Sequence, residues 1–121
     1  MSEYEVKYSK VLEFSGKKED WAVWESKFLA RARRRGFKDV LLGKTPIPPD
    51  SEQIDETTET GKLKTKAKEQ NVLGYEDLML SIKTDTDEGI ITFQIIKNCE
   101  SAEYPDGNVA KAWKNLKVNS T

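Results

Sequence analysis

Histidine is absent from the 121-residue sequence, and cysteine occurs only once, at Cys99. Histidine is the most common general base and metal ligand in proteins, so its absence excludes most sites for acid–base catalysis and zinc binding. A single cysteine also excludes a disulfide within the chain. The sequence therefore predicts a protein that is not an enzyme and that binds no metal, cofactor or small-molecule substrate.

Long apolar runs are absent as well. No segment approaches the roughly 20 apolar residues that cross a bilayer, and residues 1–5 lack the basic and apolar character of a signal peptide. A lone cysteine is typical of a reducing compartment. We expect a cytoplasmic protein that has no contact with a membrane.

Charge is nearly balanced, with a formal net charge of −1, but it is distributed in blocks. Residues 17–44 contain nine Lys or Arg and four Asp or Glu. Residues 45–61 contain five acidic residues and no basic residue, and residues 71–108 contain eight acidic and two basic residues. Such blocks predict a basic face and separate acidic faces, which favour oriented association between proteins over general attraction to nucleic acid.

The apolar residues, 36% of the chain, recur with helical periods, which predicts one all-α domain over residues 1–121. We expect a bundle of about five helices. Residues 1–13 are expected to form an amino-terminal arm that packs against the first helix. Prolines and acidic residues between Thr45 and Lys62 predict a long mobile loop over residues 45–62.

The first helix is predicted over Asp20–Arg35. Its apolar stripe, with steps of three and four residues, consists of Trp21, Trp24, Phe28 and Ala32. Gly36 is expected to end the helix in the left-handed conformation, with Phe37 folding back as a hydrophobic contact. A short helical turn is predicted to follow and to end at Gly43.

A second long helix is predicted over about Lys64–Ile82, and a last helix after Pro105-Asp106. Between them, residues 90–96 fit a helix or a strand by periodicity alone. We predict a helix because Asp85 and Glu88 precede the segment with the spacing of a capping box. The expected core consists of Trp21, Trp24, Phe28, Tyr75, Leu78, Ile95 and Trp113.

Basic residues gather at the end of the first helix, and they are Arg31, Arg33, Arg34, Arg35 and Lys38. Such a cluster can bind nucleic-acid phosphates, because cationic side chains release counterions. The alternative is a solvated helix end with favourable helix-dipole interactions, since no aromatic residue interleaves with the cluster to stack on bases. A further hypothesis is that this basic face contacts an acidic surface of a neighbouring copy.

Other candidate features have structural explanations. The segment Asp85-Thr86-Asp87 resembles the catalytic triplet of aspartic proteases, but a helix cap accounts for it, because that triplet requires a small third residue. Cys99 lies on the apolar side of its predicted helix, where a buried, inert thiol is expected. Trp21, Trp24 and Trp113 are expected in the core with their indole nitrogens reaching loop carbonyls, whereas an exposed tryptophan would indicate a contact surface.

Three short motifs, taken in order, resemble the Gag proteins of copia-type long-terminal-repeat retrotransposons. Phe14-Ser15-Gly16 and the tryptophan-bearing helix resemble the start of their capsid region. Residues 37–43 resemble their short aromatic, aliphatic and glycine segment before a proline-containing loop. Residues 106–116 resemble their D-A-x-x-A-W-x-x-L helix, with two extra residues between Asp106 and Ala112. The motif and core positions are Phe14, Gly16, Trp21, Trp24, Phe28, Gly36, Phe37, Trp113 and Leu116.

This resemblance runs from about Leu12 to Leu116, and it implies the fold of a capsid amino-terminal lobe. It also implies self-association into virus-like particles that package RNA, in a Gag protein or a domesticated Gag-derived protein. The implied partners are further copies of the chain, other Gag molecules and RNA. Two alternatives stay open: a nucleic-acid-binding module that uses Arg31–Lys38, and a truncated Gag-derived regulator that interferes with capsid assembly.

Overall fold

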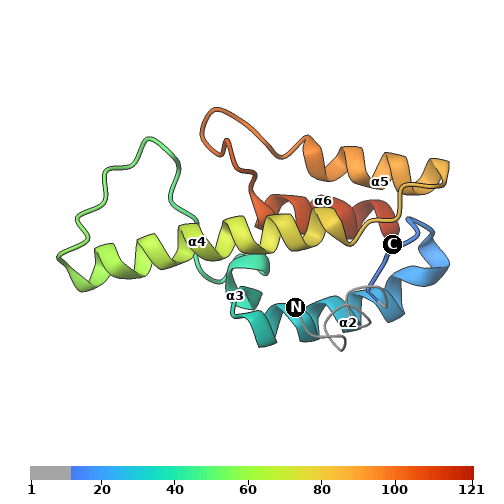
Figure 1. Ribbon diagram of the computed structural model, residues 1–121, viewed down its shortest axis with the longest axis horizontal. Helices are drawn as coiled ribbons and strands as arrows, with labels where there is room; N and C mark the ends of the chain where they lie inside the picture. The colour runs from blue at the N-terminus through green and yellow to red at the C-terminus, as the bar shows by residue number, and fades with distance from the viewer. Residues whose placement is uncertain (1–11) are drawn as a thin grey trace.

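The computed structural model describes residues 12–121, and this part of the chain is all-α, with five helices and no strand beyond an isolated bridge. The helices are α2 (Lys18–Arg35), α3 (Lys38–Leu41), α4 (Glu59–Leu80), α5 (Asp87–Lys97) and α6 (Val109–Ser120). Figure 1 shows α4 running along the molecule, with α2 and α3 below it and α5 above it, while α6 lies against α3, α4 and α5. The predicted all-α class and the helix at residues 90–96 are confirmed, whereas most of the predicted arm, residues 1–11, lies outside the described residues.

The helix α2 begins at Lys18, two residues before its predicted start. Its buried residues are the predicted stripe of Trp21, Trp24, Phe28 and Ala32. Gly36 ends the helix with a φ of 88°, and its N–H donates to the carbonyl of Arg33 at 3.3 Å. The next N–H, of Phe37, donates to the carbonyl of Ala32 at 2.9 Å, which completes a Schellman motif. Phe37 is thereby directed into the core, as predicted.

The helix α4 begins at Glu59, five residues before its predicted start, so the predicted loop over residues 45–62 extends too far. Thr58 caps this helix, because its side-chain oxygen accepts a hydrogen bond from the N–H of Gly61 at 2.9 Å. A side chain at Gly61 would overlap the carbonyl of Asp55, so glycine allows the preceding loop to approach closely. The early start was missed because the first turns of α4 face solvent and carry no apolar stripe.

The helix α5 begins with the same arrangement. Thr86 accepts a hydrogen bond from the N–H of Gly89 at 3.1 Å, and a side chain at Gly89 would overlap the carbonyl of Lys83. The predicted cap, Asp85, is therefore wrong by one residue. The buried positions of the helix are Gly89, Thr92 and Ile96. Their spacing turns Ile95 partly away from the core, so the prediction that Ile95 is buried is also wrong.

The start of α6 is fixed by a buried side chain of α4. Asn71 donates through Nδ2 to the carbonyl of Gly107 at 2.8 Å, and its Oδ1 accepts a hydrogen bond from the N–H of Val109 at 2.8 Å. The loop before α6 also meets the loop before α4, where the hydroxyl of Tyr104 donates to the carbonyl of Ile47 at 3.0 Å. These contacts satisfy buried backbone groups and hold α6 against α4.

Candidate interaction surfaces

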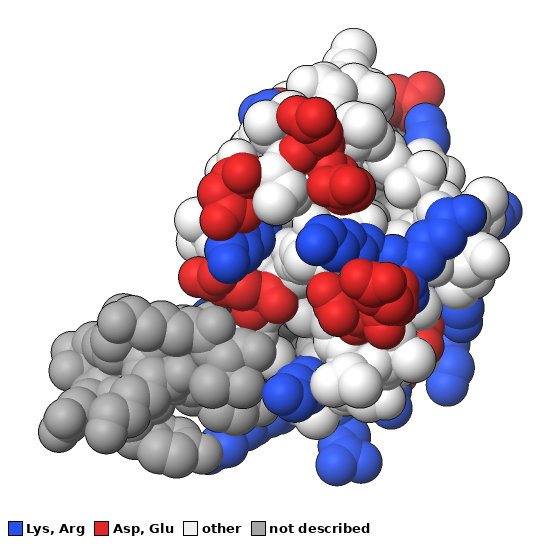
Figure 2. Space-filling view, turned by 90° about the vertical axis from the view of Figure 1, so that its right-hand side faces the viewer, with Lys and Arg blue, Asp and Glu red and all other residues white. Residues whose placement is uncertain are grey.

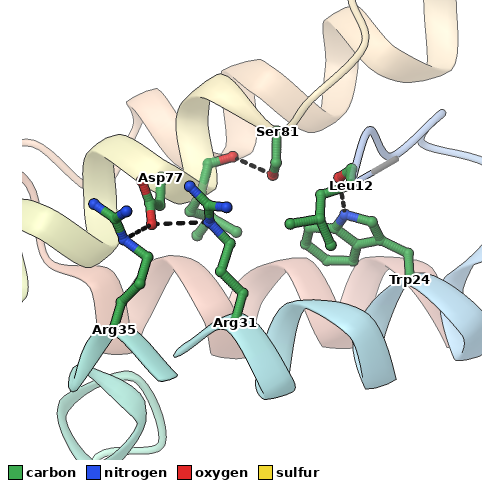
Figure 3. A network of polar contacts seen from close by, with 7 residues as sticks. Leu12, Trp24, Arg31, Arg35, Asp77 and Ser81 are labelled. Atoms are coloured by element: carbon green, nitrogen blue, oxygen red, sulfur yellow. Dashed lines mark hydrogen bonds and ion pairs between the residues drawn. The ribbon is translucent and has the colours of Figure 1, made fainter. Parts of the chain in front are cut away.

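The basic cluster at the end of α2 is divided by the fold. Arg31 and Arg35 lie one turn apart and both reach the α4 residue Asp77 (Figure 3). The Nε of Arg31 lies 3.1 Å from Oδ2 of Asp77, and the Nε of Arg35 lies 2.8 Å from the same oxygen. One carboxylate therefore joins two turns of α2 to α4.

The pair of Asp77 and Arg31 is largely shielded from water, since their side chains are 10% and 17% exposed, whereas the side chain of Arg35 is 41% exposed. Hydrogen bonds between charged groups are stronger than neutral ones, particularly where water is excluded. A phosphate that displaced Asp77 from Arg31 would remove one partner from a shielded carboxylate, which is costly for such a charge. Arg31 is consequently a poor candidate for binding nucleic acid, whereas Arg35 contacts Asp77 through Nε and keeps an exposed side chain.

The other predicted members of the cluster form no ion pair with Asp77. Arg33 and Arg34 are exposed, and Lys38 is half-buried. All the exposed large apolar residues of the described part are aliphatic, so no exposed aromatic ring is present there on which bases could stack. The cluster thus contains two arginines bound to Asp77, of which Arg35 is also exposed, two exposed arginines without that contact, Arg33 and Arg34, and the half-buried Lys38. Sequence reasoning missed Asp77, which lies 46 residues from Arg31 and has no local signal.

A groove of about 140 Å³ lies beside these ion pairs, with Leu12 and Leu80 in its lining. The indole nitrogen of Trp24 donates to the carbonyl of Leu12 at 2.6 Å, which confirms for this tryptophan the predicted bond to a loop carbonyl (Figure 3). The same segment pairs with the chain after α4, because the N–H of Phe14 donates to the carbonyl of Ser81 at 2.7 Å. The segment before α2 is therefore anchored on both α2 and α4.

The aromatic residues of the sequence motifs form a single buried cluster. Its rings are Phe14, Trp21, Trp24, Phe28, Phe37 and Trp113. Phe14 stacks on Trp24 with ring centroids 4.8 Å apart, and Phe28 stacks on Trp113 at 5.6 Å. All three tryptophans are buried, as predicted, and Leu116 of α6 is buried with them. No tryptophan is therefore available as an exposed contact residue.

Two glycines of the motifs have backbone roles. Gly36 closes α2, as described above. Gly16 has a φ of 86°, and a side chain there would overlap the backbone of Glu88. A left-handed backbone conformation and a close approach both favour glycine. Gly16 therefore lets the segment before α2 pack against the start of α5.

The groups that sequence reasoning weighed for catalysis have structural surroundings. Thr86 caps α5, which accounts for the Asp85–Asp87 segment. Burial raises the pKa of the Cys99 thiol, so the reactive thiolate is disfavoured. Burial, together with the neighbouring Glu100, also raises the pKa of the Tyr75 hydroxyl. Among residues 12–121, no group of three or more Cys, Asp or Glu side chains is placed to hold a metal ion.

A second surface is apolar. The exposed large apolar residues are Val23, Leu42, Leu63, Leu80, Ile90, Ile91 and Val118. Singly exposed residues of this kind are normal, but Ile90, Ile91 and Val118 lie on the two paired helices α5 and α6. Sequence reasoning placed Ile95 of this segment in the core and did not predict that Ile90 and Ile91 are exposed. The signal that was available is the number of apolar residues in α5, which exceeds what one helix face can bury.

Comparison with known proteins identifies no relative, because no protein family, no curated protein and no solved structure matches the chain. Within the described residues, no helix combines the length and the apolar character needed to cross a bilayer. Functional conclusions therefore rest on the surfaces and the motif residues of the chain itself.

Proposed function

We propose that the chain is a non-enzymatic, cytoplasmic self-association module, similar to the amino-terminal capsid-like region of a copia-type Gag protein, that contributes to virus-like particle assembly. The observation that carries this proposal is the shared aromatic cluster. Phe14, Trp24 and Trp113 belong to motifs at opposite ends of the sequence. The ring centroid of Trp24 lies 4.8 Å from that of Phe14 and 5.8 Å from that of Trp113. Motif residues that pack together are expected if the motifs specify one fold.

In the proposed mechanism, the core of the domain and its outer surface have different roles. The aromatic cluster and the Asp77 ion pairs make a rigid unit, and the outer faces of its helices contact neighbouring copies. Each contact can be weak, because symmetry repeats it many times in a closed shell. The exposed pair Arg33 and Arg34 supplies a basic surface for an acidic neighbour.

RNA binding is the second candidate function, and the exposed pair Arg33 and Arg34 is the observation that favours it. Two exposed arginines give a small electrostatic contribution, because affinity for nucleic acid grows with the number of phosphates neutralised. The capture of Arg31 and Arg35 by Asp77 leaves this surface weaker than the sequence suggests. Self-association is therefore the function that the geometry favours.

The test is sedimentation velocity of the full 121-residue chain over a wide concentration range, with and without single-stranded RNA, at low and moderate salt. Growth into dimers or larger particles without RNA is the expected result. A chain that stays monomeric and shifts only with RNA at low salt would instead support the nucleic-acid function. A chain that stays monomeric in every condition and co-sediments only with a full-length Gag protein would support the regulator, and self-association would be withdrawn.

A further inference from the structure

The outward surface of α5 and α6 exposes apolar side chains at positions where a solvent-facing helix usually carries polar ones. Ile90 is 53% exposed, Ile91 is 57% exposed and Val118 of α6 is 73% exposed. Ile95 of α5 is half-buried. A surface helix normally carries polar residues opposite its core face, so apolar residues on the outer side of both helices point to a surface that another molecule covers.

The two helices run antiparallel, with α5 above α6 in Figure 1. Near the end of α5, the amide of Asn115 lies 3.8 Å from the sulfur of Cys99. Near its start, Ile91 and Asn119 line the same hollow of about 590 Å³. The first turn of α5 therefore lies beside the last turn of α6, and the last turn of α5 lies beside the first turns of α6.

Opposite charges occupy the two ends of this surface. Asp87 and Glu88 are exposed in the first turn of α5, and Lys111 and Lys114 are exposed in the first half of α6. Within the described part of the chain, none of these four residues belongs to an ion pair. Figure 2, which faces the end of the molecule where α2 and α5 begin, shows acidic side chains in its upper part and a second acidic group below a band of basic side chains.

Ile95 and Val118 lie midway between the charged ends, whereas Ile91 lies about 5 Å from the acidic pair along α5. With a rise of about 1.5 Å per residue, the acidic pair and the basic pair are separated by about 20 Å along the two helices. Counting from the contact between Cys99 and Asn115, Ile95 and Val118 both lie about 5 Å towards the acidic end, which is close to the midpoint. The surface is thus acidic, apolar and basic in order along its length.

We infer that this surface binds the same surface of a second copy, antiparallel, about a two-fold axis that passes near Ile95 and Val118. In that arrangement Asp87 and Glu88 of each copy face Lys111 and Lys114 of the other. Both charge contacts form together, because a two-fold interface pairs each patch with its complement twice. The inference rests on the proposed self-association and names its surface. Lys17 and Lys18, on the α2 side of the hollow, remain at the edge of the contact.

Charge reversal gives the sharpest test. One variant of the full chain carries Asp87→Lys and Glu88→Lys, and a second carries Lys111→Glu and Lys114→Glu. Each variant alone places like charges opposite each other at both ends, so its dimer dissociation constant should rise at least about tenfold over wild type. An equimolar mixture of the two variants places opposite charges at both ends, so the mixture should regain association close to that of wild type.

A substitution of an apolar by a charged residue tests the centre of the surface. It leaves the first turn of α5, which the charge variants alter, unchanged. Val118→Asp should raise the dissociation constant at least about tenfold, because the contact would bury an unpaired carboxylate. Leu63→Asp is the matched control, since Leu63 is 66% exposed on α4 and lies outside this surface. It should leave association unchanged. Circular dichroism confirms that each variant keeps its helix content.

The outcomes separate the surface from the proposed function. A wild-type chain that remains monomeric at every concentration would overturn both. A wild-type chain that associates, together with charge variants and a Val118→Asp variant that associate equally well, would overturn this surface alone. Association that is lost in each charge variant and recovered in their mixture would establish the antiparallel two-fold contact. A folding defect within one variant would not be repaired by adding the other variant.

Discussion

Gly74 lies inside α4, where glycine is unfavourable, and replacing it by alanine tests how tightly α3 and α4 pack. Alanine is favoured over glycine in a helix interior by about 1 kcal/mol. On propensity alone, Gly74→Ala should therefore stabilise the protein. The packing predicts the opposite, because a Cβ at Gly74 would lie 2.7 Å from Cδ2 of the Phe37 ring and 3.1 Å from its Cγ.

The ring of Phe37 has little room to move away. It is fully buried, and its centroid lies 5.9 Å from that of Phe28 in the aromatic cluster. Adding a methyl group to a filled core costs about 1–3 kcal/mol. A 2.7 Å approach to a fully buried ring places the cost in the upper part of this range, at about 2–3 kcal/mol. After the gain of about 1 kcal/mol in helix propensity is subtracted, we expect Gly74→Ala to lower the free energy of unfolding by about 1–2 kcal/mol. The melting temperature should fall by roughly 3–8 °C.

Urea unfolding followed by circular dichroism measures the change, and a second background identifies its cause. Phe37→Leu removes the ring, and leucine can turn its branch away from position 74. In that background Gly74→Ala should cost less or become stabilising, with a coupling energy of about 1–3 kcal/mol between the two substitutions. A Gly74→Ala protein as stable as wild type would refute the reasoning, and so would an equal cost in both backgrounds.

Two other predictions concern the ion pairs and the thiol. Asp77→Ala should lower the free energy of unfolding by about 1–3 kcal/mol, because it leaves the shielded guanidinium of Arg31 unpaired. Glu76→Ala, one residue earlier and exposed, should change it by less than about 0.5 kcal/mol, and equal effects in urea unfolding would contradict the structural role of Asp77. Cys99 should react with iodoacetamide at mildly alkaline pH at least about tenfold more slowly in the folded protein than in urea, because burial hides the sulfur and raises the pKa of its thiol. Similar rates in the two states, followed by mass spectrometry, would show that the thiol is accessible.

The helices that the sequence predicts best are those whose local signals agree. In α2, an apolar stripe, acidic residues at the start, arginines at the end and Gly36 all mark the same boundaries. In α4, the first turns have no stripe, and the only local sign is the cap formed by Thr58 and Gly61. The same Thr-x-x-Gly spacing begins α5, where Asp85 competed with Thr86 as the expected cap. The choice between adjacent caps depends on the loop that approaches the glycine, which is a tertiary contact.

The candidate basic site shows a different limit. Its five residues were found by composition, and their positions at the end of α2 follow from helical spacing. Which of them stay free depends on Asp77, a residue of another helix, and helical periodicity within α2 carries no information about it. Ile95 of α5 was wrongly assigned to the core for a related reason. Periodicity shows which residues share a helix face, but it does not show which face is buried. In α5 the buried face includes Gly89 and Thr92, which are small or polar and do not look like core residues in the sequence.

Hydrogen bonds and ion pairs within the domain occupy some of its surfaces and leave others available to a partner. The side of the molecule between α2 and α4 is closed by the Asp77 ion pairs and by the bond from Trp24 to Leu12. The junction of α4 and α6 is closed by Asn71. The outer surface of α5 and α6 has no comparable internal contacts, yet it exposes Ile91 and Val118 between opposite charges. These exposed side chains are what the proposed association through α5 and α6 requires, because association would remove them from water.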